Sequence, residues 1–273
     1  MKGTLYIVAT PIGNRADLTP RAIETLRRVS LIVAEDTRHS APLLAWAGIS
    51  TSVRSYHAHN EAEQAPRLVE RLLSGSDIAL ISDAGTPLVS DPGGRLVEAA
   101  VAAGIVVTPI PGASAILAAL VGSGLPAASF TFLGFLPRAV GERAAAAASA
   151  LALPHTVILY EAPPRVGELL STLATAGGGD RRAVVARELT KVHEEFRRGT
   201  VAELAAYYEA TAPRGEVVVL IDGAPAAVPD HEAAARRAGA LRASGTSVRD
   251  TVRHLQEEFG VARNEAYRLA QDS

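Results

Sequence analysis

The chain contains no cysteine, and this absence excludes disulfides, thiolate metal sites and thiol nucleophiles. Aromatic residues make up only 4% of the 273 residues, whereas 48% are hydrophobic, so the core must consist of alanine, valine, leucine and isoleucine. This hydrophobic content suits a globular fold and argues against disorder. The lack of cysteine is compatible with a reducing compartment, and we expect the protein in the cytoplasm.

Long apolar runs and a strong excess of one charge are also missing. No uninterrupted apolar stretch approaches the about 18 residues of a membrane-spanning helix, so we expect no membrane partner. The 27 basic and 29 acidic residues give a net charge of −2, which offers no support for nucleic-acid binding. Any contact with RNA must therefore come from local groups of arginine.

Three loops rich in glycine and proline each follow a short apolar run, at residues 10–14, 82–94 and 111–114. In an open α/β sheet, loops at the carboxyl ends of the strands are where small molecules bind. The loops contain neither the G-x-G-x-x-G dinucleotide motif nor the G-x-x-x-x-G-K-[ST] phosphate motif. The pattern therefore indicates a cofactor of adenosine size that carries no phosphate.

Apolar runs alternate with helical patterns along the first 120 residues, and this alternation predicts a mostly parallel sheet covered by helices. A second α/β region follows a boundary rich in glycine and proline near 120–135. In that region we expect a surface helix over 144–152 and a plain loop at 177–179. The expected strands are residues 4–9, 31–34, 78–81 and 105–110 in the first region, and 156–160, 183–186 and 216–221 in the second.

The predicted fold class is therefore α/β, with two domains and a small helical module. We expect an N-terminal domain over 1–120, a second domain over 121–223 and a helical module over 230–273, after a linker at 224–230 that contains prolines. Three short helices around Gly260 suit a helix-turn-helix-like module. Seven arginines balanced by seven acidic residues leave a generic helical cap on the second domain equally open.

Pairs of opposite charge follow three of the expected strands. Surface ion pairing is the simple interpretation, and the alternative is that the pairs line one shared cleft and position a polar substrate. The alternating His57 and His59 lack a third metal ligand at suitable spacing, so we expect no metal site and favour a general base or an RNA contact. The charged residues are Asp36, Arg38, Glu161, Arg165, Arg187 and Lys191.

Nine short motifs occur in order along the chain. They are ATPIGN at 9–14, AEDTR at 34–38, YHAHNE at 56–61, SDAGTP at 82–87, SDPG at 90–93, PGAS at 111–114, LGFLP at 133–137, YEAPPR at 160–165 and RELTK at 187–191. Together they resemble the tetrapyrrole methylase superfamily, and within it the branch that methylates the 2′-oxygen of a cytidine in small-subunit ribosomal RNA. Members that act on porphyrins usually carry Gly-Asp-Pro where this chain has Asp83-Ala84-Gly85, and this departure favours the RNA branch.

This resemblance implies a homodimer of two α/β domains that binds S-adenosylmethionine in the cleft between them. It implies small-subunit ribosomal RNA as the partner, and the near-neutral charge favours RNA within an assembled ribosomal particle. Carried over onto this chain, the cofactor-binding residues are Pro11, Asp83, Ala84, Gly85, Ser114 and Ala115 in the first domain, and Tyr160, Leu189, Pro213 and Gly215 in the second.

Methyl transfer to a ribose hydroxyl needs alignment and benefits from a base and from a cation near the oxygen. We expect Lys191 near that oxygen, with Asp36, His59 or Glu161 as the base, and the sequence does not choose among them. Arg38 is expected beside Asp36 in the catalytic cleft and, with Arg165 and Arg187, as a contact to RNA phosphates. Two competing functions stay open, a C-methyltransferase acting on a tetrapyrrole and a non-catalytic binding protein.

Overall fold

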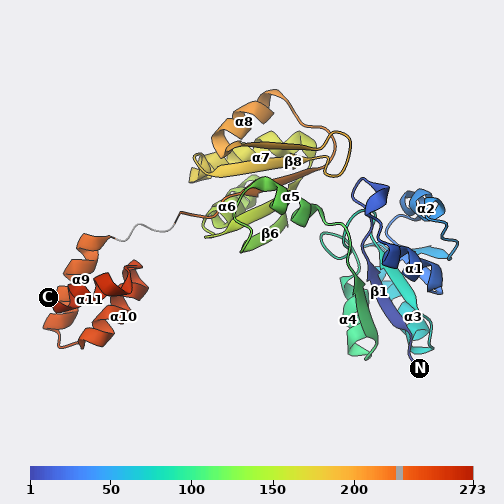
Figure 1. Ribbon diagram of the computed structural model, residues 1–273, viewed down its shortest axis with the longest axis horizontal. Coiled ribbons are helices and arrows are strands. Elements are labelled where there is room, and N and C mark those ends of the chain that lie inside the picture. The colour runs from blue at the N-terminus through green and yellow to red at the C-terminus, as the bar shows by residue number, and fades with distance from the viewer. Residues whose placement is uncertain (226–229, 273) are drawn as a thin grey trace. The chain divides into compact units, whose positions relative to one another are not determined.

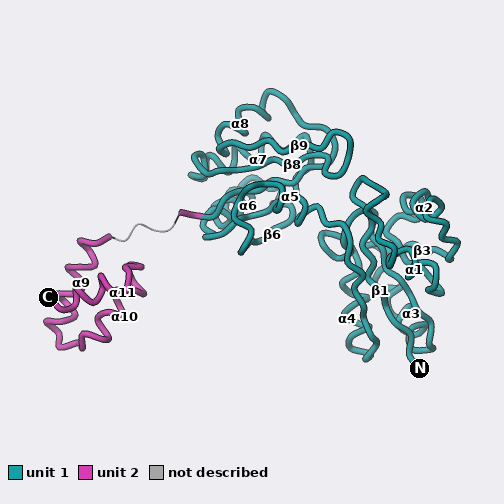
Figure 2. The backbone as a smooth tube through the Cα atoms, viewed as in Figure 1, with its two compact units in different colours: residues 1–223 teal, residues 224–273 magenta. Residues whose placement is uncertain are grey.

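The computed structural model describes residues 1–225 and 230–272, in two compact units that comprise residues 1–223 and 224–273 (Figure 2). The first unit contains two five-stranded sheets with helices on both faces (Figure 1). The α/β class is thus confirmed. The predicted linker at 224–230 includes residues 226–229, which lie outside the described residues.

The first sheet is entirely parallel, with the strand order β3-β2-β4-β1-β5. Leu5 and Ile7 of β1 face a core beneath α3 and α4, whereas Val8 faces a core beneath α1 and α2. Helix α1 begins where Thr19 caps it and Pro20 occupies its first turn. The bounds are β1 Thr4–Val8, β2 Leu31–Ala34, β3 Val53–Ser55, β4 Ile78–Ile81, β5 Val106–Ile110, α1 Pro20–Arg28, α2 Thr37–Trp46, α3 Glu61–Leu73 and α4 Gly94–Ala102.

The second sheet is mixed, with the order β6-β7-β10-β8-β9. Only β6 and β7 pair in parallel, and the other neighbours are antiparallel. Helix α5 packs on one face, and the core on the other face lies beneath α6, α7 and α8. The bounds are β6 Phe130–Phe135, β7 Thr156–Glu161, β8 Arg182–Arg187, β9 Glu195–Thr200, β10 Val217–Ile221, α5 Ala115–Ser123, α6 Val140–Leu151, α7 Val166–Leu173 and α8 Val201–Ala210.

The helix expected on the surface is α6, and the exposed Ala144, Ala145, Ala148 and Ser149 confirm it, while Arg143 and Ala147 lie on its buried face. The segment expected as a plain loop instead continues from α7 as a wide helical turn over Ala174–Gly178, interrupted at Gly177, where φ is 95°.

The second unit consists of α9 His231–Ala243, α10 Val248–Phe259 and α11 Arg263–Gln271. These helices enclose a core of their own, in which Leu255 is fully buried. Gly260 ends α10 in the left-handed conformation, as the turn requires. In the described part of the chain, no helix is long and apolar enough to cross a membrane.

Candidate functional site

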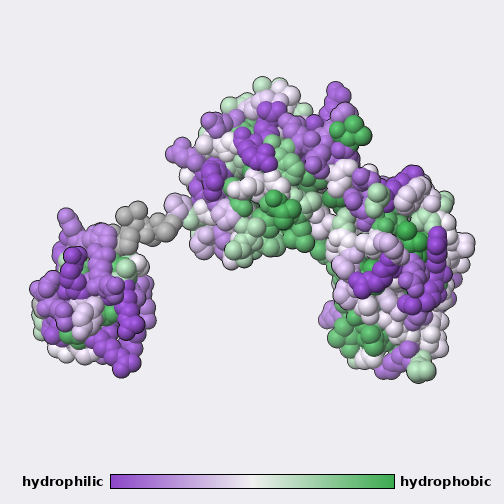
Figure 3. Space-filling view, in the orientation of Figure 1, coloured by the Kyte–Doolittle hydropathy of each residue, from purple (hydrophilic) through white to green (hydrophobic). Residues whose placement is uncertain are grey.

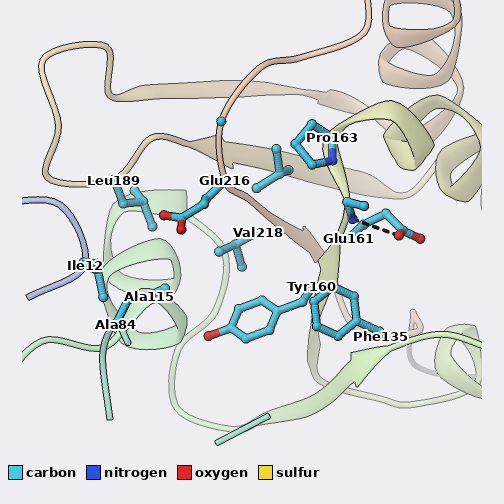
Figure 4. A pocket seen from close by; sticks show the side chains of 13 residues that line it. Ile12, Ala84, Ala115, Phe135, Tyr160, Glu161, Pro163, Leu189, Glu216 and Val218 are labelled. Carbon is cyan, nitrogen blue, oxygen red and sulfur yellow. Dashed lines mark hydrogen bonds between the residues drawn. The ribbon is translucent and has the colours of Figure 1, made fainter. Parts of the chain in front are cut away.

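A cavity of about 350 Å³ lies within the first unit, where loops after β1 and β4 and the start of α5 meet β7 and β10 (Figure 4). Its walls are largely apolar. The ring of Tyr160 projects into the space, with its hydroxyl directed toward the side where Ile12 and Ala84 lie (Figure 4). The lining residues are Ile12, Ala84, Ala115, Phe135, Tyr160, Glu161, Ala162, Pro163, Leu189, Gly215, Glu216, Val217 and Val218.

The cavity brings together many of the residues expected to bind the cofactor. Ala84, Ala115, Tyr160, Leu189 and Gly215 line it directly. A small hollow of about 30 Å³ shares part of its lining with the cavity. It adds Gly85 and Ser114, which were expected to bind the cofactor, and Thr86 and Val89, which were not.

Other expected cofactor residues lie elsewhere. Pro11 and Asp83 line a more polar hollow of about 410 Å³ together with Arg15 and Arg38. Pro213 lines a third hollow, of about 230 Å³, beside Arg187, Tyr207 and Tyr208. The residues expected in one cleft are therefore distributed over separate depressions of the surface.

The loops after β1 and β4 form a wall between the cavity and the polar hollow. Thr10 and Gly85 exchange two backbone hydrogen bonds, 2.9 and 3.0 Å long, which tie the loops together. Ile12 and Ala84 line the cavity, while Pro11 and Asp83 line the hollow. Successive residues thus face opposite sides of the wall.

Lys191 is held by two carboxylates beside the cavity. Its Nζ donates to Glu188 Oε1 at 2.7 Å and to Glu216 Oε2 at 3.0 Å. Burial alone lowers the pKa of Lys191, but the hydrogen bonds to these carboxylates outweigh it and raise the pKa overall. The same contact lowers the pKa of Glu188. Lys191 therefore stays charged, next to Leu189 and Glu216 in the cavity wall.

Asp36, one of the expected bases, caps α2, and its carboxylate is hydrogen-bonded to Arg38. Oδ1 of Asp36 accepts from the backbone N–H of Arg38 at 2.8 Å, and Oδ2 accepts from Nη2 at 3.0 Å. These hydrogen bonds lower the pKa of Asp36 to about 2. So weak a base accepts a proton poorly near neutral pH.

Glu161, the second expected base, contributes to the cavity wall, but its carboxylate points away from the space (Figure 4). Oε2 accepts from Nη2 of the buried Arg143 at 3.1 Å, and Oε1 accepts from the backbone N–H of Ala162 at 2.9 Å. Arg165 approaches the same carboxylate at 3.7 Å. This group is therefore engaged in holding the end of β7.

His59, the third expected base, is exposed in the turn between β3 and α3, with its ring centre 5.9 Å from that of His57. The two histidines lie outside a strand, because β3 ends at Ser55 before them. Among the described residues, no group of three or more histidines and carboxylates is arranged to hold a metal ion.

The arginines expected to contact RNA do not converge. Arg38 is 89% exposed beside the polar hollow. Arg165 pairs with Glu161 and Glu168, and Arg187 pairs with Glu195 at 3.2 Å. Sequence reasoning missed Arg15, which shares the hollow with Arg38. The position of Arg15 immediately after the ATPIGN motif is the sequence feature that could have identified it.

A group of acidic side chains gathers at the carboxyl ends of β2 and β4, and sequence reasoning did not connect them. Burial is the largest cause of the raised pKa of Glu35. The negative charges of Asp83 and Asp36 raise this pKa further, whereas His57 acts to lower it. Burial, followed by the charges of Glu35 and Asp83, raises the pKa of Asp91 to about 6. Four carboxylates thus share one region of the first unit.

The backbone is strained in the two loops next to the cavity. Leu88 and Ser90 have φ values of 73° and 66°, and Glu188 and Thr190 have values of 52° and 66°. Each such residue costs about 1–3 kcal/mol and persists only where its surroundings impose it, commonly at ligand sites. The strain therefore marks both loops as parts of the site.

The sequence and the fold match a known class of proteins. The family model described as Tetrapyrrole (Corrin/Porphyrin) Methylases matches residues 4–205. A solved structure titled uroporphyrin-III C-methyl transferase from Thermus thermophilus, complexed with S-adenyl homocysteine, superposes with a TM-score of 0.58 at 18% identity, over 81% of this chain and 97% of that one. At this identity the likeness concerns the fold.

Similarity in sequence leads to a narrower group. The protein named "Ribosomal RNA small subunit methyltransferase I" of Mesorhizobium japonicum is 51% identical over 83% of this chain and 77% of its own length. The protein of the same name from Pseudomonas aeruginosa is 45% identical over 98% of this chain and 96% of its own length. The chain belongs to the tetrapyrrole methylase family, in the group that contains these ribosomal RNA small subunit methyltransferase I proteins.

Proposed function

We propose that this protein transfers a methyl group from S-adenosylmethionine to the 2′-oxygen of a cytidine ribose in small-subunit ribosomal RNA. The observation that carries the proposal is the 45% identity to the Pseudomonas aeruginosa relative over 98% of this chain, because it extends through both units. The name of that relative states ribosomal RNA methylation. The cytidine and the 2′-oxygen are what the resemblance carried by the nine motifs implies.

The cavity fits S-adenosylmethionine in size and chemistry. Its volume lies within the range typical of small-molecule sites. The ring of Tyr160, in edge contact with Phe132 at 4.8 Å between centroids, offers a face for an adenine. Gly215 lines the cavity at φ 83°, and a side chain there would collide with Glu188, so this position favours glycine.

When bound, the cofactor supplies a methyl carbon attached to a positively charged sulfur. The protein has to hold the ribose oxygen in line with that carbon. Lys191 remains our candidate for stabilising negative charge that develops on the oxygen, because its carboxylate partner Glu216 and its neighbour Leu189 both line the cavity. Arg15 and Arg38 beside the polar hollow are candidates for phosphate contacts.

The proposed substrate is a cytidine in a single-stranded or splayed-out segment, because an RNA helix buries base edges from side chains. A net charge of −2 supports binding to an assembled particle in the cytoplasm more than tight binding to free RNA. Comparing naked RNA with small subunits as substrates tests this point, and equal modification of both would contradict it.

The decisive experiment incubates the full chain with tritiated S-adenosylmethionine and small ribosomal subunits lacking the modification, followed by nucleoside mass spectrometry. We expect labelled 2′-O-methylcytidine, and a large loss of label with the Lys191→Met variant. Label in a porphyrinogen and none in RNA would instead support the tetrapyrrole methyltransferase. Binding of RNA and cofactor without turnover would support the non-catalytic protein.

We also propose that the protein is a homodimer. Exposed apolar side chains gather over α5 and β6, and again over α4, on the face shown in Figure 3. An exposed apolar surface of this kind is typical of a protein–protein interface. The large exposed apolar residues on α4, β5, α5 and β6 are Val101, Val106, Leu117, Val121, Phe130, Leu133 and Phe135.

Sedimentation velocity tests the dimer and its surface. The wild-type chain should sediment as a dimer, and Val121→Arg, at a side chain 78% exposed on α5, should shift it toward the monomer. Val140→Arg, at a side chain 83% exposed at the start of α6, is the matched control and should remain dimeric. A monomeric wild type would overturn the proposal.

A further inference from the structure

The polar hollow, which lies across the loop wall from the cofactor cavity, combines apolar and cationic surfaces. Pro11, Pro42 and Leu43 contribute apolar side chains to its lining. Arg15 and Arg38 are exposed and form a cationic rim. The volume of about 410 Å³ lies within the range typical of small-molecule sites. The hollow therefore suits a ligand that has a flat apolar face and a negative charge.

Two polar residues, Ser40 and Asp83, line the less exposed side of the hollow, which we call its floor. Ser40 is only 3% exposed, and its Oγ has no hydrogen-bond partner among the described residues. Oδ1 of Asp83 accepts from the backbone N–H of Asp36 at 3.1 Å, which orients the carboxylate. Buried polar groups are normally hydrogen-bonded, so the unpartnered hydroxyl marks a place where a ligand supplies the missing partner.

The rim and the floor differ in charge. Arg15 forms no ion pair in the described part of the chain, and the side chain of Arg38 is 89% exposed. A phosphate is attracted to this rim and repelled by the carboxylate of Asp83 on the floor. The floor instead favours a group that donates a hydrogen bond. Cytosine presents such a donor in its exocyclic amine, whereas uracil presents a carbonyl acceptor at the same position.

Lys191 connects the polar hollow to the cofactor cavity. Gly13 lines the hollow, and a Cβ added to it would lie 2.4 Å from Cγ of Lys191, so the lysine stem packs against the hollow's edge. At its other end, Nζ of Lys191 donates to Glu216, which lines the cavity. A nucleotide with its base in the hollow would therefore bring its ribose toward the lysine expected near the reacting oxygen.

We propose that the polar hollow holds the base of the target nucleotide, and that Asp83 recognises it as cytosine by accepting a hydrogen bond from its exocyclic amine. The inference rests on the proposed function and adds to it the residues that select the base. Ser40 donates from its hydroxyl to an acceptor on the same edge of the base. Arg15 and Arg38 hold the neighbouring phosphate. A uracil is rejected, because its carbonyl oxygen and the Asp83 carboxylate are both acceptors.

The test compares small ribosomal subunits that carry cytidine or uridine at the modified position. The full-length wild type should methylate the cytidine with a kcat/KM about 5- to 150-fold higher than that for uridine. Asp83→Asn should bring the two values within about threefold of each other, because a carboxamide both donates and accepts. Asp180→Asn, an exposed aspartate, is the matched control and should keep the wild-type preference. Equal methylation of both subunits by the wild type overturns the inference.

The affinity of Asp83→Asn for S-adenosylmethionine distinguishes base recognition from the cofactor binding that the resemblance implies for Asp83. The asparagine can still accept from the backbone of Asp36, so the loop should keep its conformation. Calorimetric titration should give an affinity within about twofold of wild type. A large loss of cofactor affinity would instead assign Asp83 to the cofactor site and overturn the inference.

Ser40→Ala removes the unpartnered hydroxyl from the floor of the hollow. It should lower kcat/KM for the cytidine by about 2- to 12-fold and leave the melting temperature unchanged, because no internal hydrogen bond is lost. Thr251→Val is the matched control, since it removes another buried hydroxyl without a described partner, in α10 of the second unit. It should leave kcat/KM at the wild-type value. An unchanged kcat/KM in Ser40→Ala contradicts the role of this hydroxyl.

Nucleotide binding tests the base site without methyl transfer. In calorimetric titrations of the wild type, cytidine 5′-monophosphate should bind more tightly than uridine 5′-monophosphate, and Asp83→Asn should lose this preference. Equal binding of the two nucleotides by the wild type overturns the inference. A wild type that prefers the cytidine nucleotide and methylates no RNA supports the base site and contradicts the proposed function itself.

Discussion

Arg143 and Glu161 form an ion pair 3.1 Å long in which both side chains are almost completely buried. Arg143 comes from α6 and Glu161 ends β7, so the pair joins a helix to the strand that carries Tyr160. Nε of Arg143 has no hydrogen-bond partner, and its Nη1 approaches Glu168 only at 3.4 Å. The buried positive charge of Arg143 is therefore balanced mainly by the carboxylate of Glu161.

Arg143→Met should reduce the free energy of unfolding by about 3–5 kcal/mol, because it leaves the Glu161 carboxylate buried without its closest cation. Chemical denaturation followed by circular dichroism measures the change. The double variant Arg143→Met with Glu161→Leu should recover much of the loss, since neither charge is then buried alone.

The control for that variant is Arg182→Met. Arg182 pairs with Asp222 at 2.5 Å, but the arginine side chain is 63% exposed. Its loss should cost no more than about 1 kcal/mol, as for other surface pairs. Equal effects of the two arginine variants would show that the buried pair has no special role in stability.

Much of the fold could be predicted because the buried strands are short, continuous apolar runs. Every residue of Ile78–Ile81 in β4 is buried, and such a run has few alternatives in an α/β chain. The edge strands β3, β6 and β9 were not predicted. β3 has only three residues, β6 lies largely in the segment interpreted as a boundary rich in glycine and proline, and β9 is polar. Glu195–Thr200 in β9 contains two arginines and a glycine, and pairing with β8 stabilises it as a strand.

The candidate site was predictable as a set of loops and not as a set of facing side chains. The motifs identified the loops after β1, β4 and β8, but the side of the wall on which a residue lies depends on backbone register. Ala84 lines the cavity, whereas the adjacent Asp83 lines the hollow. Asp91 is read from sequence as part of a turn, and only the tertiary fold brings it near Glu35.

Gly215→Ala tests the backbone of the cavity wall. Gly215 is at φ 83°, where an added side chain is strained by about 1–2 kcal/mol and would collide with the carboxylate of Glu188. Because Glu188 holds Lys191, the displacement should weaken cofactor binding and methyl transfer as well as stability. Calorimetric titration with S-adenosylmethionine measures the loss of affinity.

Gly124→Ala supplies the matched control. Gly124 has nearly the same φ, 80°, but no atom lies within 4 Å of an added Cβ. This variant should show the conformational cost alone, with cofactor affinity unchanged. If both variants lose affinity equally, the contact with Glu188 is not the cause.

Tyr160→Ala removes the ring that projects into the cavity. Stacking of a base on an aromatic side chain contributes about 1–3 kcal/mol, so the dissociation constant of S-adenosylmethionine should rise by about 5- to 150-fold. Tyr160→Phe should bind within about twofold of wild type, because the hydroxyl makes no hydrogen bond to described residues. Weakened binding by the phenylalanine variant alone would assign the effect to the hydroxyl and contradict stacking.

The C-terminal unit should unfold independently of the cofactor site. Leu255 is fully buried in the core formed by α9, α10 and α11, so Leu255→Ala should lower the stability of this unit by about 2–5 kcal/mol. Hydrogen exchange should then show faster exchange confined to residues 231–271, with unchanged affinity for S-adenosylmethionine. Tyr267→Ala, at a side chain 50% exposed on α11, is the control and should leave exchange near wild type. Loss of cofactor affinity in Leu255→Ala would show instead that the stability of the two units is coupled.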